Sequence, residues 1–170
     1  MAERLSLREF QQQLAERLQA AAQGTSNQSK LGFVAGGRHW LTDLNQVNEV
    51  VTVGQMTPIP WSLPWFVGMA SVRGALYGCT DFALYQGLPG SPGKGEHRLL
   101  LVHPRFGVNA ALRIDRALGL RNVEDMAAVE GIAETADWIK GRWQDEAGGE
   151  WTEVDMERLV ASPRFLAVGQ

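Results

Sequence analysis

Residues 44–74 read LNQVNEVVTVGQMTPIPWSLPWFVGMASVRG, and this stretch decides the fold. Its apolar and β-branched residues lie in short segments that glycine and proline interrupt. The prolines between residues 58 and 64 exclude long regular structure there, because proline has no backbone N–H to donate. Residues 67–72 and 75–79 predict two strands joined at Arg73 and Gly74. The pattern is typical of a protein built from short β-hairpins.

The same texture continues on both sides of this stretch. Residues 31–35 and 38–42 predict a hairpin that turns at Gly36 and Gly37. Further strands are predicted at residues 49–53, 98–103, 107–114, 116–123, 138–143 and 151–154, and short helices at residues 43–48, 81–85 and 155–160. The sequence therefore predicts a mainly β protein. We expect the chain to cross from a first lobe to a second near residues 81–98 and to return late, so that the first lobe also takes C-terminal residues.

The first 29 residues differ from the rest. Residues 1–23 predict an amphipathic helix, with Leu7, Phe10, Leu14 and Leu18 on one stripe, and polar residues follow as a linker. We therefore divide the chain into 1–29, helix and linker, and 30–170, the β domain. The apolar stripe either packs on its own domain, which is the usual role of such a helix, or docks a partner.

Composition excludes several classes of protein. The chain has 170 residues and a net charge of −3, which argues against a nucleic-acid surface. Its single cysteine cannot form an intramolecular disulfide, and no apolar run is long enough for a membrane span. The N-terminus lacks the pattern of a signal peptide, so a cytoplasmic location is expected, with no direct membrane insertion.

No constellation of residues predicts catalysis, a cofactor or a metal. The three histidines have no acidic or cysteine neighbour at ligand spacing, and Cys79 lies in an apolar strand, where cysteine is usually inert. Neither a nucleophile elbow nor a phosphate-binding glycine loop is present. Asp43, Asp81 and Asp115 follow strands, where capping of backbone amides is the ordinary role. A site assembled from residues distant in sequence remains open.

Charged and aromatic residues are unevenly distributed. Eleven carboxylates lie between residues 124 and 157, where only Lys140 and Arg142 offset them. This run either solvates a face or orients a partner by charge complementarity. Among the tryptophans, Trp61 and Trp65 flank a proline and are expected to be partly exposed, whereas Trp40, Trp143 and Trp151 are expected in the core.

One ordered series of residues resembles the CheW-like domain family. The series comprises Leu44, Val47, Glu49 and Val50, then Pro58-Ile59-Pro60, then WFVGMASVRG at residues 65–74, then Asp81-Phe82. Later segments also resemble the family, so the similarity extends over about residues 30–160. The sequence departs from the family pattern at Ser71-Val72 and at Gly78. These departures resemble the PilI-like branch, which serves type IV pili.

The resemblance implies a fold, a function and a site. The family folds as two small five-stranded SH3-like barrels, here flanked by the N-terminal helix and a C-terminal helix. Its members are non-catalytic adaptors that bind the cytoplasmic tip of a methyl-accepting chemoreceptor and a CheA-type histidine kinase. Carried over by position, Val47, Arg73 and Gly74 are the candidate receptor-facing residues. An ion pair between Arg73 and the chain's own Glu49 or Asp81 is the alternative for that side chain.

Other functions stay open on the residues alone. The first is a peptide- or protein-binding β-barrel module outside chemotaxis, and the second is an enzyme with a site assembled from distant residues. A pocket with convergent titratable groups would favour the enzyme.

Overall fold

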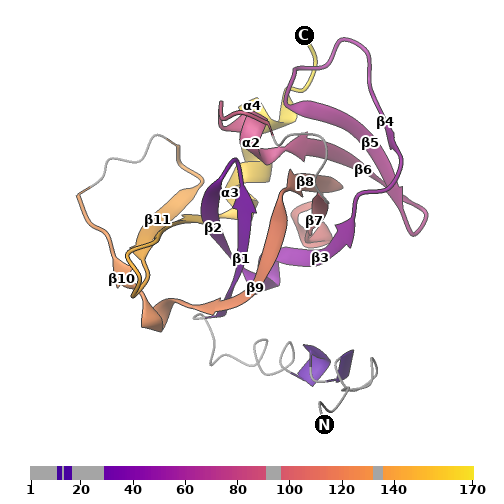
Figure 1. Cartoon of the computed structure of the whole chain (residues 1–170). Coiled ribbons are helices and arrows are strands. Elements are labelled where there is room, and N and C mark those ends of the chain that lie inside the picture. The colour runs from indigo at the N-terminus through magenta and orange to yellow at the C-terminus, as the bar shows by residue number, and fades with distance from the viewer. Residues whose placement is uncertain (1–10, 13, 17–28, 91–96, 132–135) are drawn as a thin grey trace.

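A computed structural model describes residues 11–12, 14–16, 29–90, 97–131 and 136–170. In these residues two six-stranded sheets form two lobes that lie side by side (Figure 1). The first lobe has the strand order β10-β11-β12-β2-β1-β9. Its strands are β1 (Ser29–Ala35), β2 (Arg38–Asp43), β9 (Arg116–Asn122), β10 (Ala127–Ala128), β11 (Ile139–Gln144) and β12 (Glu150–Val154).

The second lobe is one continuous part of the chain. Its order is β3-β7-β8-β6-β5-β4. The strands are β3 (Val47–Thr52), β4 (Met56–Thr57), β5 (Phe66–Val72), β6 (Ala75–Asp81), β7 (Arg98–Val102) and β8 (Ala110–Ile114). All neighbours are antiparallel in both sheets, except for one parallel pair in each: β12 with β2, and β6 with β8.

Short helices connect and cover the sheets. They are the α-helices α2 (Phe82–Tyr85), α3 (Met156–Ala161) and α4 (Pro163–Leu166), and the 3-10 turns Leu44–Gln46, Pro104–Phe106 and Val123–Asp125. Asp81 caps α2 by accepting from the Leu84 N–H at 2.9 Å, as the capping hypothesis predicted. Asp155 caps α3 in the same way. The sequence did not predict α4, which has proline at its start and spans only four residues.

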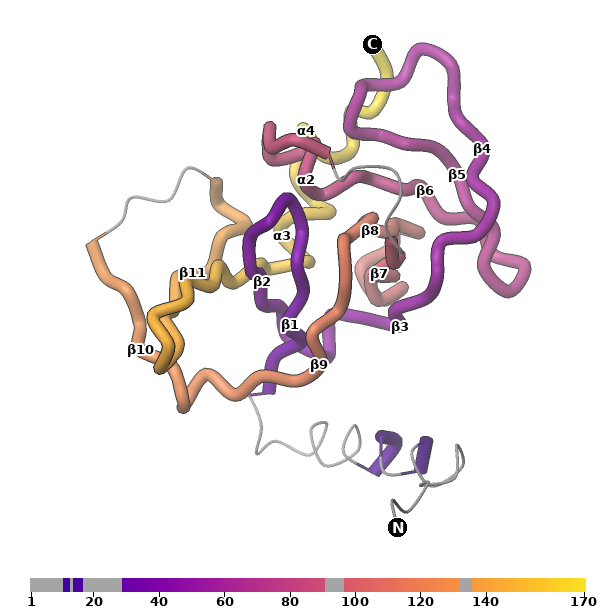
Figure 2. The backbone as a smooth tube through the Cα atoms, viewed as in Figure 1, coloured from indigo at the N-terminus to yellow at the C-terminus, as the bar shows by residue number. Residues whose placement is uncertain are grey.

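The predicted place of the lobe crossing is wrong. The chain leaves the first lobe at the 3-10 turn Leu44–Gln46, directly after β2, and returns at Asp115, directly after β8 (Figure 2). The segment between β6 and β7 instead joins two strands of the second sheet. Its glycines and prolines suggested a boundary between lobes but mark a connection within one lobe. The predicted late return does hold, because β10, β11 and β12 complete the first sheet.

The mainly β, two-lobed fold is confirmed. Each sheet has six strands where five were expected, because β4 and β10 are two-residue strands at the sheet ends. The hairpin at Gly36 and Gly37 forms as predicted, with φ of 61° and 73° at the two glycines. Most of the predicted N-terminal helix lies outside the described residues. Within it, residues 11–12 and 14–16 are helical, and Leu14 is 43% exposed.

One apolar core joins the two lobes. Phe33 and Trp40 come from the first sheet, whereas Leu100 and Leu112 come from the second, and all four are in the same buried cluster. The three α-helices add side chains to this cluster: Phe82, Tyr85, Met156, Leu159, Val160 and Phe165. The side chains of the helices therefore pack in the core that the two sheets share. In Figure 1, α2, α3 and α4 lie close together where the two lobes meet. A smaller cluster around Cys79, Leu99 and Leu101 belongs to the second lobe alone.

No helix among the described residues has the length and apolar character that a membrane span requires.

Candidate partner-binding surface

The turn between β5 and β6 consists of Arg73 and Gly74. Both residues have positive φ, 50° and 82°, as a two-residue hairpin turn with right-handed strand twist requires. Glycine adopts this conformation without strain, whereas an arginine does not. A Cβ atom at position 74 would meet nothing within 4 Å, so the turn faces open space. The tip of this hairpin is therefore an exposed, conformationally fixed surface.

Arg73 forms a two-pronged ion pair with Glu49 of β3. The guanidinium nitrogens Nη1 and Nη2 donate to the two carboxylate oxygens at 2.5 and 2.6 Å. β3 and β5 are not neighbours in the sheet, so this pair bridges from the hairpin tip to the far edge strand. The Arg73 side chain is nevertheless 75% exposed. Of the two internal carboxylates that the sequence offered, Arg73 therefore binds Glu49.

Asp81, the other carboxylate, has a different partner. It is buried and accepts from Nε and Nη2 of Arg113 at 2.8 and 2.6 Å. A buried carboxylate with such a partner is costly to disturb. The exposed pair of Arg73 and Glu49 is worth at most about 1 kcal/mol, because water screens it. Arg73 can therefore exchange Glu49 for a carboxylate or helix carbonyls of a partner at little cost to folding.

Val47 is the first residue of β3, two positions before Glu49. It pairs with Val102 across the sheet, and a bulge separates it from the Glu49 pairing. Its side chain is half-buried and packs on the core that joins the lobes. Val47 thus combines a structural contact with a partly exposed face. The structure places Val47, Arg73 and Gly74 on the same lobe and links Arg73 to the strand of Val47 through Glu49.

The titratable groups of the described residues bear on whether the chain can support chemistry. No group of three or more His, Cys, Asp and Glu side chains in the described ranges is arranged to hold a metal ion. Burial raises the pKa of the Cys79 thiol to about 11, so it stays protonated at neutral pH and is a poor nucleophile. His103 accepts from the Arg105 N–H at 3.2 Å and so starts a 3-10 turn.

Two further surface features are relevant to binding. Trp61 is 83% exposed, so the expectation of exposure holds for it, whereas Trp65 is buried and the expectation is wrong there. Trp40 and Trp151 are buried as predicted, and Trp143 is half-buried.

The sequence did not predict a groove on the first lobe, which is lined by residues around 120–126 and 145–147. The only signal for it was the acidic run that begins at residue 124.

Comparison with known proteins identifies the family. A model of the CheW-like domain matches residues 30–164. The chain is 31% identical over 157 residues to Protein PilI of Pseudomonas aeruginosa, covering 92% of this chain and 85% of that protein. The crystal structure of the scaffolding protein TtCheW from Thermoanaerobacter tengcongensis has a similar fold, with a TM-score of 0.63 at 20% identity, covering 75% of this chain and 88% of that one. The chain belongs to the CheW-like domain family.

Proposed function

We propose that the chain is a non-catalytic, cytoplasmic adaptor that couples a methyl-accepting chemoreceptor to a CheA-type histidine kinase. Membership of the CheW-like domain family supports the adaptor role. The similarity to Protein PilI, which extends over most of both chains, supports a role in a type IV pilus system that controls twitching motility. No nucleic acid and no cofactor enter this proposal.

The observation that carries the proposal is the exposed turn at Arg73 and Gly74. A guanidinium offers five donors in a fixed fork, which suits a carboxylate or the carbonyls at the end of a receptor helix. The side chain of its partner Glu49 is only 30% exposed, so Glu49 orients the guanidinium of Arg73 from the less exposed side. Val47, Arg73 and Gly74 are the residues that we propose to contact the receptor tip.

Charge reversal at Arg73 tests the receptor contact. Arg73→Glu sets a carboxylate against Glu49 and against the acid of a partner, so affinity for a receptor tip fragment should fall by about tenfold or more. Arg73→Lys keeps the charge but loses the fork and should recover little of the affinity. Isothermal titration measures both variants, and thermal melts should show that each remains folded, since the pair is exposed.

Arg116→Glu is the matched control. Arg116 is an exposed arginine in β9 of the first lobe, so this variant makes the same change in charge away from the turn. An equal loss of affinity in the control would mean that net charge, and not the turn, governs binding. An Arg73→Glu protein that melts early but binds normally once folded would make Arg73 a structural residue.

A further inference from the structure

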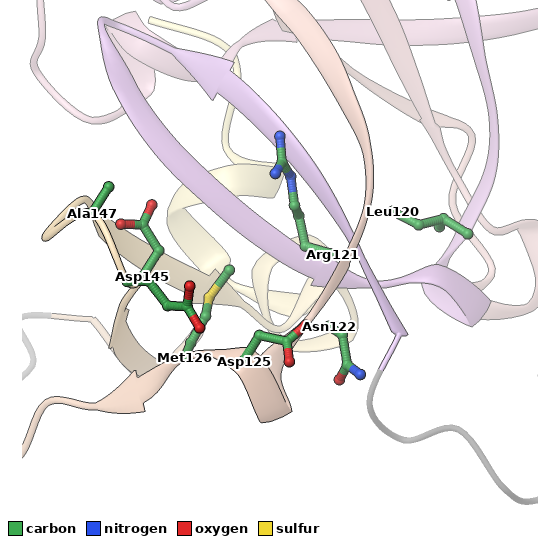
Figure 3. A pocket seen from close by; sticks show the side chains of 8 residues that line it. Leu120, Arg121, Asn122, Asp125, Met126, Asp145 and Ala147 are labelled. Carbon is green, nitrogen blue, oxygen red and sulfur yellow. The ribbon is translucent and has the colours of Figure 1, made fainter.

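A groove opens on the surface of the first lobe. It has a volume of about 480 Å³ and lies between the end of β9 and the turn that joins β11 to β12 (Figure 3). An adjoining hollow of about 350 Å³ shares four of its lining residues, so the two are continuous. We call this surface the acidic groove and define it by Leu120, Arg121, Asp125, Met126, Asp145 and Glu146.

One wall of the acidic groove is held by hydrogen bonds. The carboxylate of Asp145 accepts from the Gly149 N–H at 2.7 Å and from Nε1 of Trp151 at 2.9 Å. These bonds fix the tight turn between β11 and β12. They also lower the pKa of Asp145, with the bond from Trp151 as the largest cause, so the carboxylate is ionised at neutral pH. Figure 3 shows Asp145 on the groove side of this turn.

The opposite wall is fixed in a similar way. The side chain of Asn122 accepts from the Glu124 N–H at 3.0 Å and starts the 3-10 turn that carries Asp125. The guanidinium of Arg121 lies over the ring of Trp151, 5.4 Å from its centroid. The shape of the groove is therefore set before any partner arrives, which lowers the entropic cost of binding.

The charge of the groove is unbalanced. Its lining contains three carboxylates, Asp125, Asp145 and Glu146, against the guanidinium of Arg121, and the adjoining hollow adds Glu124. Asp125, Glu146 and Glu124 are exposed and form no ion pair within the described part of the chain. Their field is therefore available to a cation from outside the molecule.

Two apolar residues also line the groove. Leu120 is 40% exposed and Met126 is half-buried, and they lie on opposite sides of β9 (Figure 3). A lysine or arginine side chain places its aliphatic stem on apolar surface and keeps its charged end in a polar environment. The half-buried Met126, together with unpaired carboxylates in the same lining, matches such a side chain better than a bare ion.

We propose that the acidic groove docks a basic segment of a partner protein. A lysine or arginine of that segment packs its aliphatic stem on Met126, and its cationic end reaches Asp125 and Glu146. A second copy of this chain fits less well, because each copy carries a net charge of −3 and two copies repel each other. The inference depends on the first lobe alone and holds whether or not the turn at Arg73 binds a receptor.

Nuclear magnetic resonance on the full ¹⁵N-labelled chain tests the proposal. The probe is a capped decapeptide of alternating arginine and serine, and a glutamate–serine decapeptide is its charge-reversed counterpart. The basic peptide should shift the amides near Leu120–Met126 and Asp145–Gly149 to saturation, whereas the acidic peptide should shift none. The double variant Asp125→Asn/Glu146→Gln should weaken binding by about fivefold or more, because it removes two negative charges from the lining of the groove.

Glu157→Gln is the control variant. Glu157 is an exposed carboxylate of α3 outside the groove. The affinity of the Glu157→Gln variant for the basic peptide should therefore match that of the unmodified chain. Shifts spread over the whole surface, or affinity unchanged in the double variant, would overturn the proposal. Self-association of the unmodified chain in analytical sedimentation, lost in the double variant, would also overturn the proposal. It would assign the groove to a second copy of the chain. Saturable shifts of the same amides with submillimolar calcium chloride alone would assign it to an ion.

Discussion

Arg73 and Trp61 are the described residues other than glycine whose φ is positive, at 50° and 60°. This conformation costs a side chain about 1–2 kcal/mol. Both side chains are exposed, so packing in the core does not offset the cost. Trp61 is held instead by the C-terminal residues, since its carbonyl accepts from the Gln170 N–H at 2.8 Å. Strained backbone clusters at functional sites, which supports the β5–β6 turn as a binding surface.

Lys30 is a buried cation of the first lobe, with a residue exposure of 4%. Its ammonium pairs with Asp43 on β2 and lies 2.8 Å from a carboxylate oxygen of Glu153 on β12. Burial alone lowers the pKa of Lys30, but the hydrogen bonds and charges of the two carboxylates outweigh it and raise that pKa. Burial likewise works to raise the pKa of Asp43, and the bond from Lys30 overcomes it, so that pKa is lowered. The network ties three strands of one sheet together.

Acid should destabilise the protein through Asp43. Its carboxyl pKa is lower in the folded chain than in the unfolded one, so the stabilisation exists above the ordinary value of 3.8 and is lost as the pH falls through the folded pKa. Urea denaturation from pH 6 down to about pH 2.5 should show this fall. The Asp43→Asn variant lacks the titrating group. Its free energy of unfolding should therefore be lower than that of the unmodified chain at pH 6, and it should decline less steeply with acid. An equally steep decline in Asp43→Asn would assign the acid sensitivity to other carboxylates.

At the scale of elements, the 3-10 turn Leu44–Gln46 connects the lobes through Gln46. The backbone carbonyl of Gln46 accepts from the His103 N–H at 2.9 Å, at the end of β7. Its side chain accepts from the Met156 N–H at 2.9 Å and donates to Asp155 at 3.2 Å. Gln46 is buried, so one residue joins the crossing turn, the second sheet and the start of α3.

Gln46→Leu should destabilise the chain by about 1–3 kcal/mol, because it leaves the buried Met156 N–H without an acceptor. Asn45→Ala is the control, since Asn45 is exposed in the same turn and its contact with Arg105 is long, 3.5 Å. That control should change stability by less than about 0.5 kcal/mol. Chemical denaturation measures both. Equal stability of Gln46→Leu and the unmodified chain would show that the turn does not fix the lobes.

Elements set by local chemistry were predictable, and those set by distant contacts were not. The hairpin at Gly36 and Gly37 and the turn at Arg73 and Gly74 follow from glycine positions and alternating segments. The place of the lobe crossing could not be predicted, because it depends on hydrogen bonds between Gln46 and residues about 110 positions away. The carboxylates of the acidic groove were visible as a run, but their arrangement depends on β9 and the β11–β12 turn coming together. The division at residue 30 stays a prediction.

At the scale of the whole molecule, the shared core predicts one cooperative unit. Phe33, Trp40, Leu100 and Leu112 belong to different sheets but to one buried cluster, so neither lobe keeps its core if the other unfolds. Thermal unfolding should therefore show a single transition, coincident by far-ultraviolet circular dichroism and tryptophan fluorescence. Two separate midpoints would show that the lobes are independent domains.

The central claim is that this chain links a receptor to a kinase. The most direct measurement is size-exclusion chromatography with light scattering on purified components: a methyl-accepting receptor tip fragment, a CheA-type histidine kinase and this chain. A complex of all three should elute when the chain is present, and the Arg73→Glu chain should retain the kinase but lose the receptor fragment. Failure of the unmodified chain to bind either protein at micromolar concentration would contradict the account.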